Sequence, residues 1–189
     1  MRGFETALFT LLNATPDSPS WVVPLAAWIS NVLPHGAAVA LGAWLLATPS
    51  RAQRVAILQA LAGAGMAWLM VRGIRAVVHL PRPAELELGW QWLAHRGGPA
   101  LPSMHATGAF ALATGLGLSR ALPRRALWVA FAVATAMAWS RVCLGLHCPT
   151  DVAAGALCGA AGAALASTAT AWRPARGTAV RRWRAQPGR

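Results

Sequence analysis

One stretch decides how the chain is organised: Ser140-Arg141-Val142-Cys143-Leu144-Gly145-Leu146-His147-Cys148-Pro149-Thr150-Asp151. It separates two strongly apolar runs and places Arg141, His147 and Asp151 at offsets of six and four residues. Charged groups are costly next to lipid and usually face a polar interior or a water-filled site. A helix that begins near Pro149, where proline suits the first turn, puts His147 and Asp151 about one turn apart. The carboxylate can then hold one imidazole nitrogen and leave the other lone pair free to attack.

The composition around this stretch indicates an integral membrane protein. Of the 189 residues, 56% are hydrophobic and only 12% are charged, which is too apolar for an ordinary soluble domain. Five apolar runs approach the roughly 20 residues that a membrane crossing takes. They cover residues 21–47, 55–78, 104–118, 126–139 and 151–172. The first run is interrupted at Pro34-His35, and the third and fourth are short.

We therefore expect an all-α fold, a polytopic membrane helix bundle of about five transmembrane helices. Residues 3–13 add a short N-terminal helix that lies at the membrane interface, because they are too few to span it. Gly155, Gly159 and Gly162 favour close helix packing in the last run. The sequence predicts one membrane-embedded domain over residues 1–172 and a basic, disordered cytoplasmic tail over residues 173–189.

The excess of positive charge is arranged as membrane topology requires. All 17 basic residues are arginines, against five acidic residues, which gives a net charge of +12. Nucleic-acid binding is disfavoured, because no basic patch alternates with accessible aromatic residues. The turns at 48–54 and 119–125 and the tail share one face and hold eleven arginines, whereas the other face holds six. The positive-inside rule places the eleven in the cytoplasm and the signature stretch on the outer face.

Two other stretches carry chemistry that matches the first. Arg75-Ala76-Val77-Val78-His79-Leu80-Pro81-Arg82-Pro83 ends one apolar run, and Pro102-Ser103-Met104-His105 opens another. Together the three resemble the signature of the type 2 phosphatidic acid phosphatase family, which reads Lys-x6-Arg-Pro, Pro-Ser-Gly-His and Ser-Arg-x5-His-x3-Asp. The third part matches in full, while Arg75 replaces the Lys and Met104 replaces the Gly. Three ordered motifs with correct internal spacing form a specific signal, although one alone would be weak.

The resemblance implies a role for each motif residue. His147 is the nucleophile that forms a phosphohistidine, Asp151 orients it, and His105 is the general acid and then the base that activates water. Arg75, Arg82 and Arg141 suit phosphate oxygens with their guanidinium forks, and Ser103 and the amides after Pro102 add neutral donors. No metal or other cofactor is expected, because the arginines supply the positive charge. Met104 adds bulk beside His105, where it either narrows the substrate range or faces lipid.

The resemblance covers about residues 5–172 and also suggests a substrate. The opening Leu8–Asp17 looks like that of bacitracin-resistance-type undecaprenyl diphosphate phosphatases, which recycle the lipid carrier for cell-wall synthesis on the outer face of the bacterial inner membrane. The expected partners are thus a lipid phosphate or diphosphate and membrane lipids. Phosphatidylglycerol phosphate and lipid A are alternative substrates, and a non-catalytic membrane protein or transporter of the same fold is the alternative class. The sequence leaves the oligomeric state open.

Several polar residues near the motifs have no assigned role. Arg72, Arg75 and His79 are predicted to share one helical face, and His95 and Arg96 are candidates for the rim of the substrate site. Glu85 and Glu87 in the loop 84–101 fit a solvated loop, or partners of the arginines, better than a metal pair. Cys143 and Cys148 flank His147, and their spacing permits a disulfide without requiring one. Trp90 and Trp92 favour the membrane interface.

Overall fold

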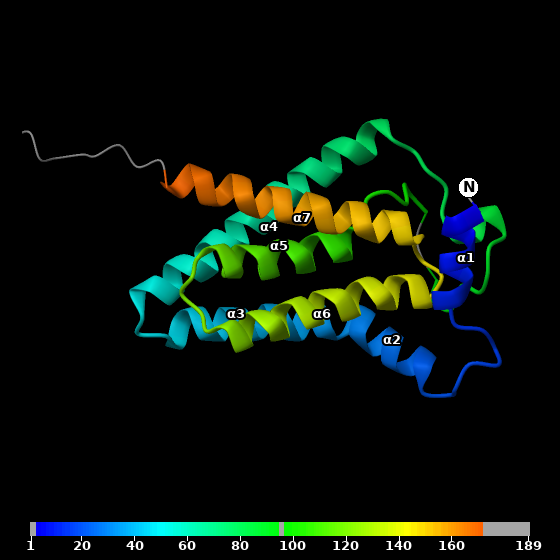
Figure 1. Ribbon diagram of the computed structural model, residues 1–189, viewed down its shortest axis with the longest axis horizontal. Helices are drawn as coiled ribbons and strands as arrows, with labels where there is room; N and C mark the ends of the chain where they lie inside the picture. Colours follow the sequence, from blue (N-terminus) through cyan, green and yellow to red (C-terminus); the bar gives the residue numbers. More distant parts are fainter. Residues whose placement is uncertain (1–2, 95–96, 172–189) are drawn as a thin grey trace, which may run out of the picture.

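The computed structural model describes residues 3–94 and 97–171, and within these ranges it consists of helices and loops without a β-strand. The predicted all-α fold is confirmed (Figure 1). The predicted tail, His95 and Arg96 lie outside the described residues. In chain order the helices are α1 (Gly3–Leu12), α2 (Val22–Asn31), α3 (Leu33–Ala47), α4 (Arg51–Val77), the 3-10 helix η1 (Pro83–Leu86), α5 (Met104–Leu118), α6 (Arg124–Cys143) and α7 (Pro149–Ala171).

Each of the five predicted apolar runs forms a helix or a pair of helices. By length and composition α4, α6 and α7 can cross a membrane, and α2 with α3, bent by 42° at a short break, can form a fourth span. α5 has 15 residues and is roughly 23 Å long, which is less than a typical hydrocarbon core. The described residues therefore contain three candidate spans, or four if the bent pair is counted as one.

α6 continues beyond its predicted end at Trp139. Ser140, Arg141 and Cys143 are all buried, and the helix ends only where the Leu144 amide donates back to the Ser140 carbonyl. Gly145 then adopts a φ of +70°, a left-handed conformation that favours glycine. The charge of Arg141 suggested a helix boundary, but the helix tolerates it because the side chain has a polar partner inside the bundle.

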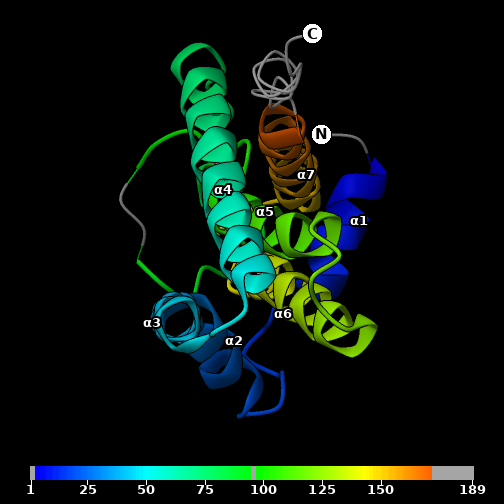
Figure 2. The ribbon, with the colours of Figure 1, turned by 90° about the vertical axis from the view of Figure 1, so that its left-hand side faces the viewer.

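Small residues bring α4, α5 and α7 together at the centre of the bundle (Figure 2). An added Cβ at Gly159 would lie 2.5 Å from the Thr107 carbonyl oxygen of α5, and one at Gly162 would lie 2.6 Å from the Ala67 amide nitrogen of α4. Both positions on α7 thus require glycine, since a side chain there would force the helices apart. The predicted close packing of this run is confirmed.

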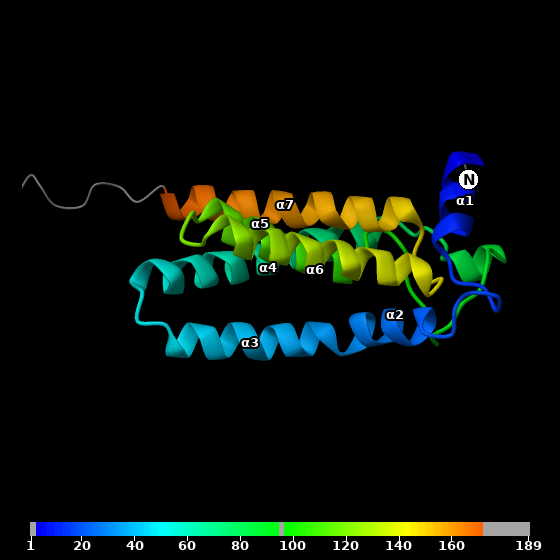
Figure 3. The ribbon, with the colours of Figure 1, turned by 60° about the horizontal axis from the view of Figure 1, so that its bottom comes forward.

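All three motifs meet at one end of the bundle (Figure 1). They occupy the last turn of α4 with the loop that follows it, the residues that lead into the first turn of α5, and the end of α6 with its connection to α7. α1 lies across the same end, steeply inclined to the long helices (Figures 1 and 3). The Thr150 hydroxyl at the start of α7 donates to the Glu5 carboxylate of α1 and links the two. The short terminal helix therefore sits beside the motifs, as an interfacial segment can.

Candidate active site

His147 and Asp151 form a buried pair at the start of α7. His147 is 2% exposed and Asp151 3% exposed, and 3.4 Å separates Nδ1 of the imidazole from Oδ2 of the carboxylate. The same Oδ2 accepts a hydrogen bond from the Cys148 amide at 2.8 Å, which fixes the carboxylate. Because α7 begins at Pro149, the sequence prediction that one helical turn separates the two side chains is confirmed. Their orientation leaves Nε2 as the ring nitrogen that can react.

The surroundings of His147 favour its neutral form. It lies in the connection between α6 and α7, outside the helices that cross the membrane. Burial lowers the pKa of His147 to about 4, with the charges of Arg82 and Arg141 acting in the same direction and Asp151 opposing them. A neutral imidazole has a lone pair at physiological pH, so the residue is suited to nucleophilic attack.

Hydrogen bonds to the main chain lock the three motifs to one another. Nε and Nη2 of Arg75 donate to the Pro102 carbonyl at 3.0 and 2.6 Å, which joins the first motif to the second. Nη1 of Arg82 donates to the Leu146 carbonyl at 2.8 Å, which joins the first to the third. The Ser103 amide donates to the Asp151 carbonyl at 2.9 Å, which joins the second to the third. The motifs thus form one connected structure although they are far apart in the sequence.

The arginines create a positive field that the protein itself neutralises only in part. Burial lowers the pKa of Arg82, and the nearby charge of Arg75 lowers it further, against the opposing effects of Asp151 and Glu85. The positive charges of three guanidinium groups therefore act on this region, where Asp151 supplies the buried carboxylate. An anion bound among them would gain charge-assisted hydrogen bonds in a site of low dielectric constant. Glu85 acts on Arg82, as predicted for a partner of the arginines.

Two buried polar atoms in this region have no hydrogen-bond partner among the described residues. They are Oγ of Ser103, which is fully buried, and Nε of Arg141, which is 3% exposed. Arg141 is held by its other end, since Nη1 donates to the Ser30 hydroxyl of α2 at 2.5 Å. Buried polar groups are nearly always paired, so each exception needs an explanation. A ligand that supplies oxygen acceptors would satisfy both.

Met104 and His105 stand on the first turn of α5, where they line an apolar groove of about 560 Å³. The groove runs between α3, α5 and α6 and reaches Leu61 of α4. Met104 therefore borders a cavity next to His105, a position that fits both alternatives that the sequence left open, an influence on the substrate and contact with lipid.

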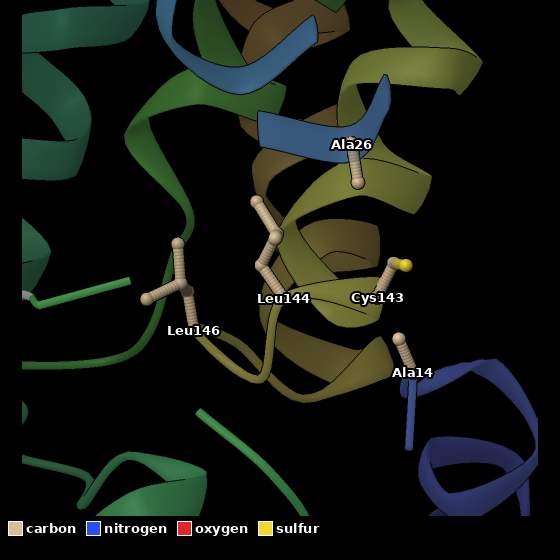
Figure 4. Close-up of a cluster of buried hydrophobic side chains, with 5 residues drawn as sticks. All are labelled: Ala14, Ala26, Cys143, Leu144 and Leu146. Carbon is tan, nitrogen blue, oxygen red and sulfur yellow. The ribbon is translucent and has the colours of Figure 1, made fainter. Parts of the chain in front are cut away.

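An apolar cluster supports the connection between α6 and α7. Its buried members are Ala14, Ala26, Cys143, Leu144 and Leu146, with α2 on one side and the segment after α1 on the other (Figure 4). The cluster fixes the backbone immediately before His147. Cys143 and Cys148 form no disulfide. Burial raises the pKa of Cys148 to about 12, with Asp151 adding to the effect, so this thiol stays protonated beside the imidazole.

Asn13 is a structural contributor that sequence reasoning missed. It is 6% exposed, and its Nδ2 donates to the Trp90 carbonyl at 2.9 Å and to the Cys143 carbonyl at 3.1 Å. Its Oδ1 accepts from the Trp90 amide at 2.7 Å. One side chain therefore joins the segment after α1, the loop 87–103 and the end of α6. Its position in Asn13-Ala14-Thr15-Pro16-Asp17 resembles an ordinary break between helices, and only the tertiary structure shows these contacts.

Some residues that the sequence grouped with the motifs lie elsewhere. α4 ends at Val77, so His79 is beyond the helix and exposed, and the predicted shared helical face with Arg72 and Arg75 is wrong at this residue. Arg72 is exposed, with its guanidinium 5.2 Å from the centre of the Trp68 ring. Within the described ranges, no three His, Cys, Asp or Glu side chains are grouped as metal ligands would be.

Comparison with known proteins agrees with the fold and the motifs. Residues 53–175 match the PAP2 superfamily. Over 173 residues, the chain is 34% identical to an Escherichia coli (strain K12) protein named "Putative undecaprenyl-diphosphatase YbjG", covering 86% of this chain and 80% of that protein. The crystal structure of Aquifex aeolicus LpxE is similar, with a TM-score of 0.68 and 22% identity over 86% of this chain and 93% of that chain. A Bacillus subtilis transmembrane PAP2 type phosphatidylglycerolphosphate phosphatase has a TM-score of 0.65 and 18% identity, over 92% and 88% of the two chains.

The protein is by class a membrane lipid phosphatase. This follows from its helical membrane fold, from the cluster of three motifs and from its relatives. Within that class, the chain belongs to the PAP2 superfamily, as the three motifs predicted. The two solved structures share the fold of this chain, although their sequences are only 22% and 18% identical to it.

Proposed function

We propose that this protein hydrolyses undecaprenyl diphosphate to undecaprenyl phosphate, at the outer face of the bacterial inner membrane. The observation that carries the proposal is the buried His147–Asp151 pair, which lies in the field of three arginines, with one guanidinium Nε unpaired. A neutral nucleophile beside concentrated positive charge suits attack on an anionic phosphate. The 34% identity to a protein named as an undecaprenyl-diphosphatase supports the substrate.

In the first chemical step, Nε2 of His147 attacks the terminal phosphorus. A nitrogen–phosphorus bond forms while the bond from phosphorus to the bridging oxygen breaks, and that oxygen leaves with its electron pair on undecaprenyl phosphate. His105 gives the leaving oxygen a proton. Asp151 accepts a hydrogen bond from the Nδ1–H group of His147 and stabilises the ring as it becomes positive. The arginines stabilise the equatorial oxygens, where negative charge concentrates in the transition state.

In the second step, His105 acts as a base. It takes a proton from water while the water oxygen attacks phosphorus, and the nitrogen–phosphorus bond breaks with its electron pair returning to His147. Inorganic phosphate leaves and the enzyme is restored. Positive charge for both steps comes from Arg75, Arg82 and Arg141, so we expect turnover to be independent of added metal ions.

The choice of lipid rests on the relative and on the positive charge of the site. A preference for a diphosphate would be explained most simply if Arg72 and Arg96, the arginines beside the motifs, contacted the second phosphate. Arg72 is exposed beside Trp68, and Arg96 lies outside the described residues, so the diphosphate preference now depends on the relative and on the excess of positive charge. The name of the Bacillus subtilis neighbour, a phosphatidylglycerolphosphate phosphatase, keeps phosphatidylglycerol phosphate as one alternative, and lipid A is the other alternative that the motif resemblance suggested.

The deciding experiment measures phosphate release by purified protein in detergent, with undecaprenyl diphosphate, phosphatidylglycerol phosphate and lipid A offered separately. We expect the largest kcat/KM for undecaprenyl diphosphate and unchanged rates after a chelator is added. A larger kcat/KM for either alternative lipid would identify that lipid as the substrate and leave the proposed reaction type unchanged. No release from any of the three would refute the phosphatase proposal, and strong inhibition by chelator would refute metal independence.

A further inference from the structure

The third helix packs against the bundle without burying any of its own residues. α3 runs from Leu33 to Ala47 and is apolar apart from His35, yet no side chain in it is buried. Figure 3 shows α3 set apart from the layer that contains α5, α6 and α7. The space beside it is the groove of about 560 Å³, whose walls come from α3, α5 and α6. Such a volume is typical of a ligand site.

The groove begins at the candidate active site and follows α5 away from it. Met104 and His105 line one part of it, and Leu116 lines another, eleven residues along the same helix. At the rise of an α-helix, this corresponds to roughly 17 Å, or about half of a hydrocarbon core. Apart from His105, every side chain in the lining is apolar. The groove can therefore solvate a hydrocarbon chain over much of one membrane leaflet.

The reaction chemistry indicates what enters the groove. In the mechanism proposed above, His105 gives a proton to the leaving oxygen, and this oxygen belongs to the part of the substrate that carries the lipid chain. The lipid must therefore extend from the His105 side of the site. His105 also lines the groove, whose other lining residues are apolar. The groove therefore starts at the point where the leaving group departs.

We propose that this groove binds the hydrocarbon chain of the lipid substrate, and that Gly108 and Gly42 on two of its walls keep it wide enough for the chain. This inference rests on the proposed phosphatase function and assigns a specificity site to it. Gly108 is one turn from Met104 on α5, and Gly42 is on α3. The groove then selects substrates by their chain, while the arginines select them by their phosphate.

The two glycines differ from those that hold the bundle together. An added Cβ at Gly108 or at Gly42 has no atom within 4 Å, whereas an added Cβ at Gly159 lies 2.5 Å from a main-chain oxygen. A larger side chain at position 108 or 42 therefore enters open space and leaves helix packing intact. Gly117 is a matched control, because it lies on α5, is also open within 4 Å and does not line the groove.

The experiment compares Gly108→Leu, Gly42→Leu and Gly117→Leu with the wild type on two substrates, undecaprenyl diphosphate and isopentenyl diphosphate, whose five-carbon chain barely enters the groove. We expect each groove variant to lose about tenfold or more in kcat/KM on the long substrate, mainly through KM, because a side chain of several carbons displaces that much chain. On the short substrate, both should stay within about twofold of the wild type. Gly117→Leu should match the wild type on both.

Two results would overturn the inference. Unchanged long-substrate kinetics in both groove variants would mean that the groove holds only bulk membrane lipid. An equal loss on both substrates in both groove variants would mean that they damage the site or the fold and select no chain. A failure of the function itself is distinguishable, since wild-type protein would then release phosphate from neither substrate.

Discussion

At the scale of single residues, the two histidines have different positions and hence different expected roles. His147 is buried against Asp151, whereas His105 is half-buried at the start of the groove. His147→Ala should abolish turnover, because no other described side chain in the cluster is placed to form the covalent intermediate. His105→Ala should lose roughly 10²–10⁴-fold, as is typical for a general acid, and should lose less on a substrate with a good leaving group. Steady-state phosphate release measures both effects, and wild-type activity in either variant would refute its assigned role.

The low pKa of His147 predicts a pH dependence of stability. Its pKa is about 4 in the folded protein, against about 6.5 in an unfolded chain. Between these values the unfolded state binds the extra proton, so the stability present above pH 6.5 is lost as the pH falls toward 4, by up to about 3 kcal/mol.

Melting curves in detergent between pH 7 and pH 4.5 test this sign, with His147→Asn as the control. The wild type should lose melting temperature faster than the variant as the pH falls. Parallel curves would show that His147 titrates normally and would contradict the burial argument.

At the scale of elements, Asn13 connects three segments that the sequence leaves separate. Asn13→Ala removes the bonds to the Trp90 amide and carbonyl and to the Cys143 carbonyl. Leaving such buried groups unpaired costs about 1–3 kcal/mol each. The melting temperature should fall, and kcat should fall more than KM rises, because the backbone before His147 loosens while the groove remains.

Asn31→Ala is the matched control for this element, since Asn31 ends α2 and is exposed. It should behave as the wild type in melting and in kinetics. If Asn13→Ala lowered the melting temperature but left kcat unchanged, Asn13 would have only a structural role.

The sequence was informative about elements wherever composition decides the structure. The runs 104–118 and 151–172 were placed within two residues of the observed helices, because apolar composition and the prolines around them define their ends. The extension of α6 through Arg141 could not be predicted, since it depends on the Ser30 hydroxyl, 111 residues away in the chain. The groove could not be predicted either, because it depends on how far α3 stands from α5.

In the candidate site, too, the contacts between residues close in the sequence could be predicted and the contacts between distant residues could not. The motif spacing put His147 and Asp151 in contact, since that relation is local to one helical turn. The bonds from Arg75 to Pro102 and from Arg82 to Leu146 join distant motifs through main-chain oxygens, which every residue has. No residue pattern identifies such acceptors, so the connected form of the site emerges only in three dimensions.

At the scale of the whole molecule, the distribution of arginines predicts an orientation in the membrane. The motif end of the bundle is opposite the turns that hold Arg51, Arg54, Arg120, Arg124 and Arg125 (Figure 1). The positive-inside rule places those turns in the cytoplasm. A reporter fused after residue 122 should therefore read as cytoplasmic, and one inserted near Gly98 as external. Activity of alkaline phosphatase and fluorescence of a cytoplasmic reporter at both sites test this, and the reversed pattern would put catalysis on the inner leaflet.

The unpaired Oγ of Ser103 and Nε of Arg141 also have a consequence for the behaviour of the purified protein. A folded chain that keeps two buried donors without acceptors is stabilised by any oxyanion that reaches them, and the unfolded chain gains nothing comparable. Orthophosphate at a hundred times its dissociation constant should add about 2.7 kcal/mol to the free energy of unfolding. The reaction product should therefore raise the melting temperature, and Arg141→Ala should remove most of that increase. A protein so stabilised by its own product is also expected to be slowed by it, in competition with the lipid substrate.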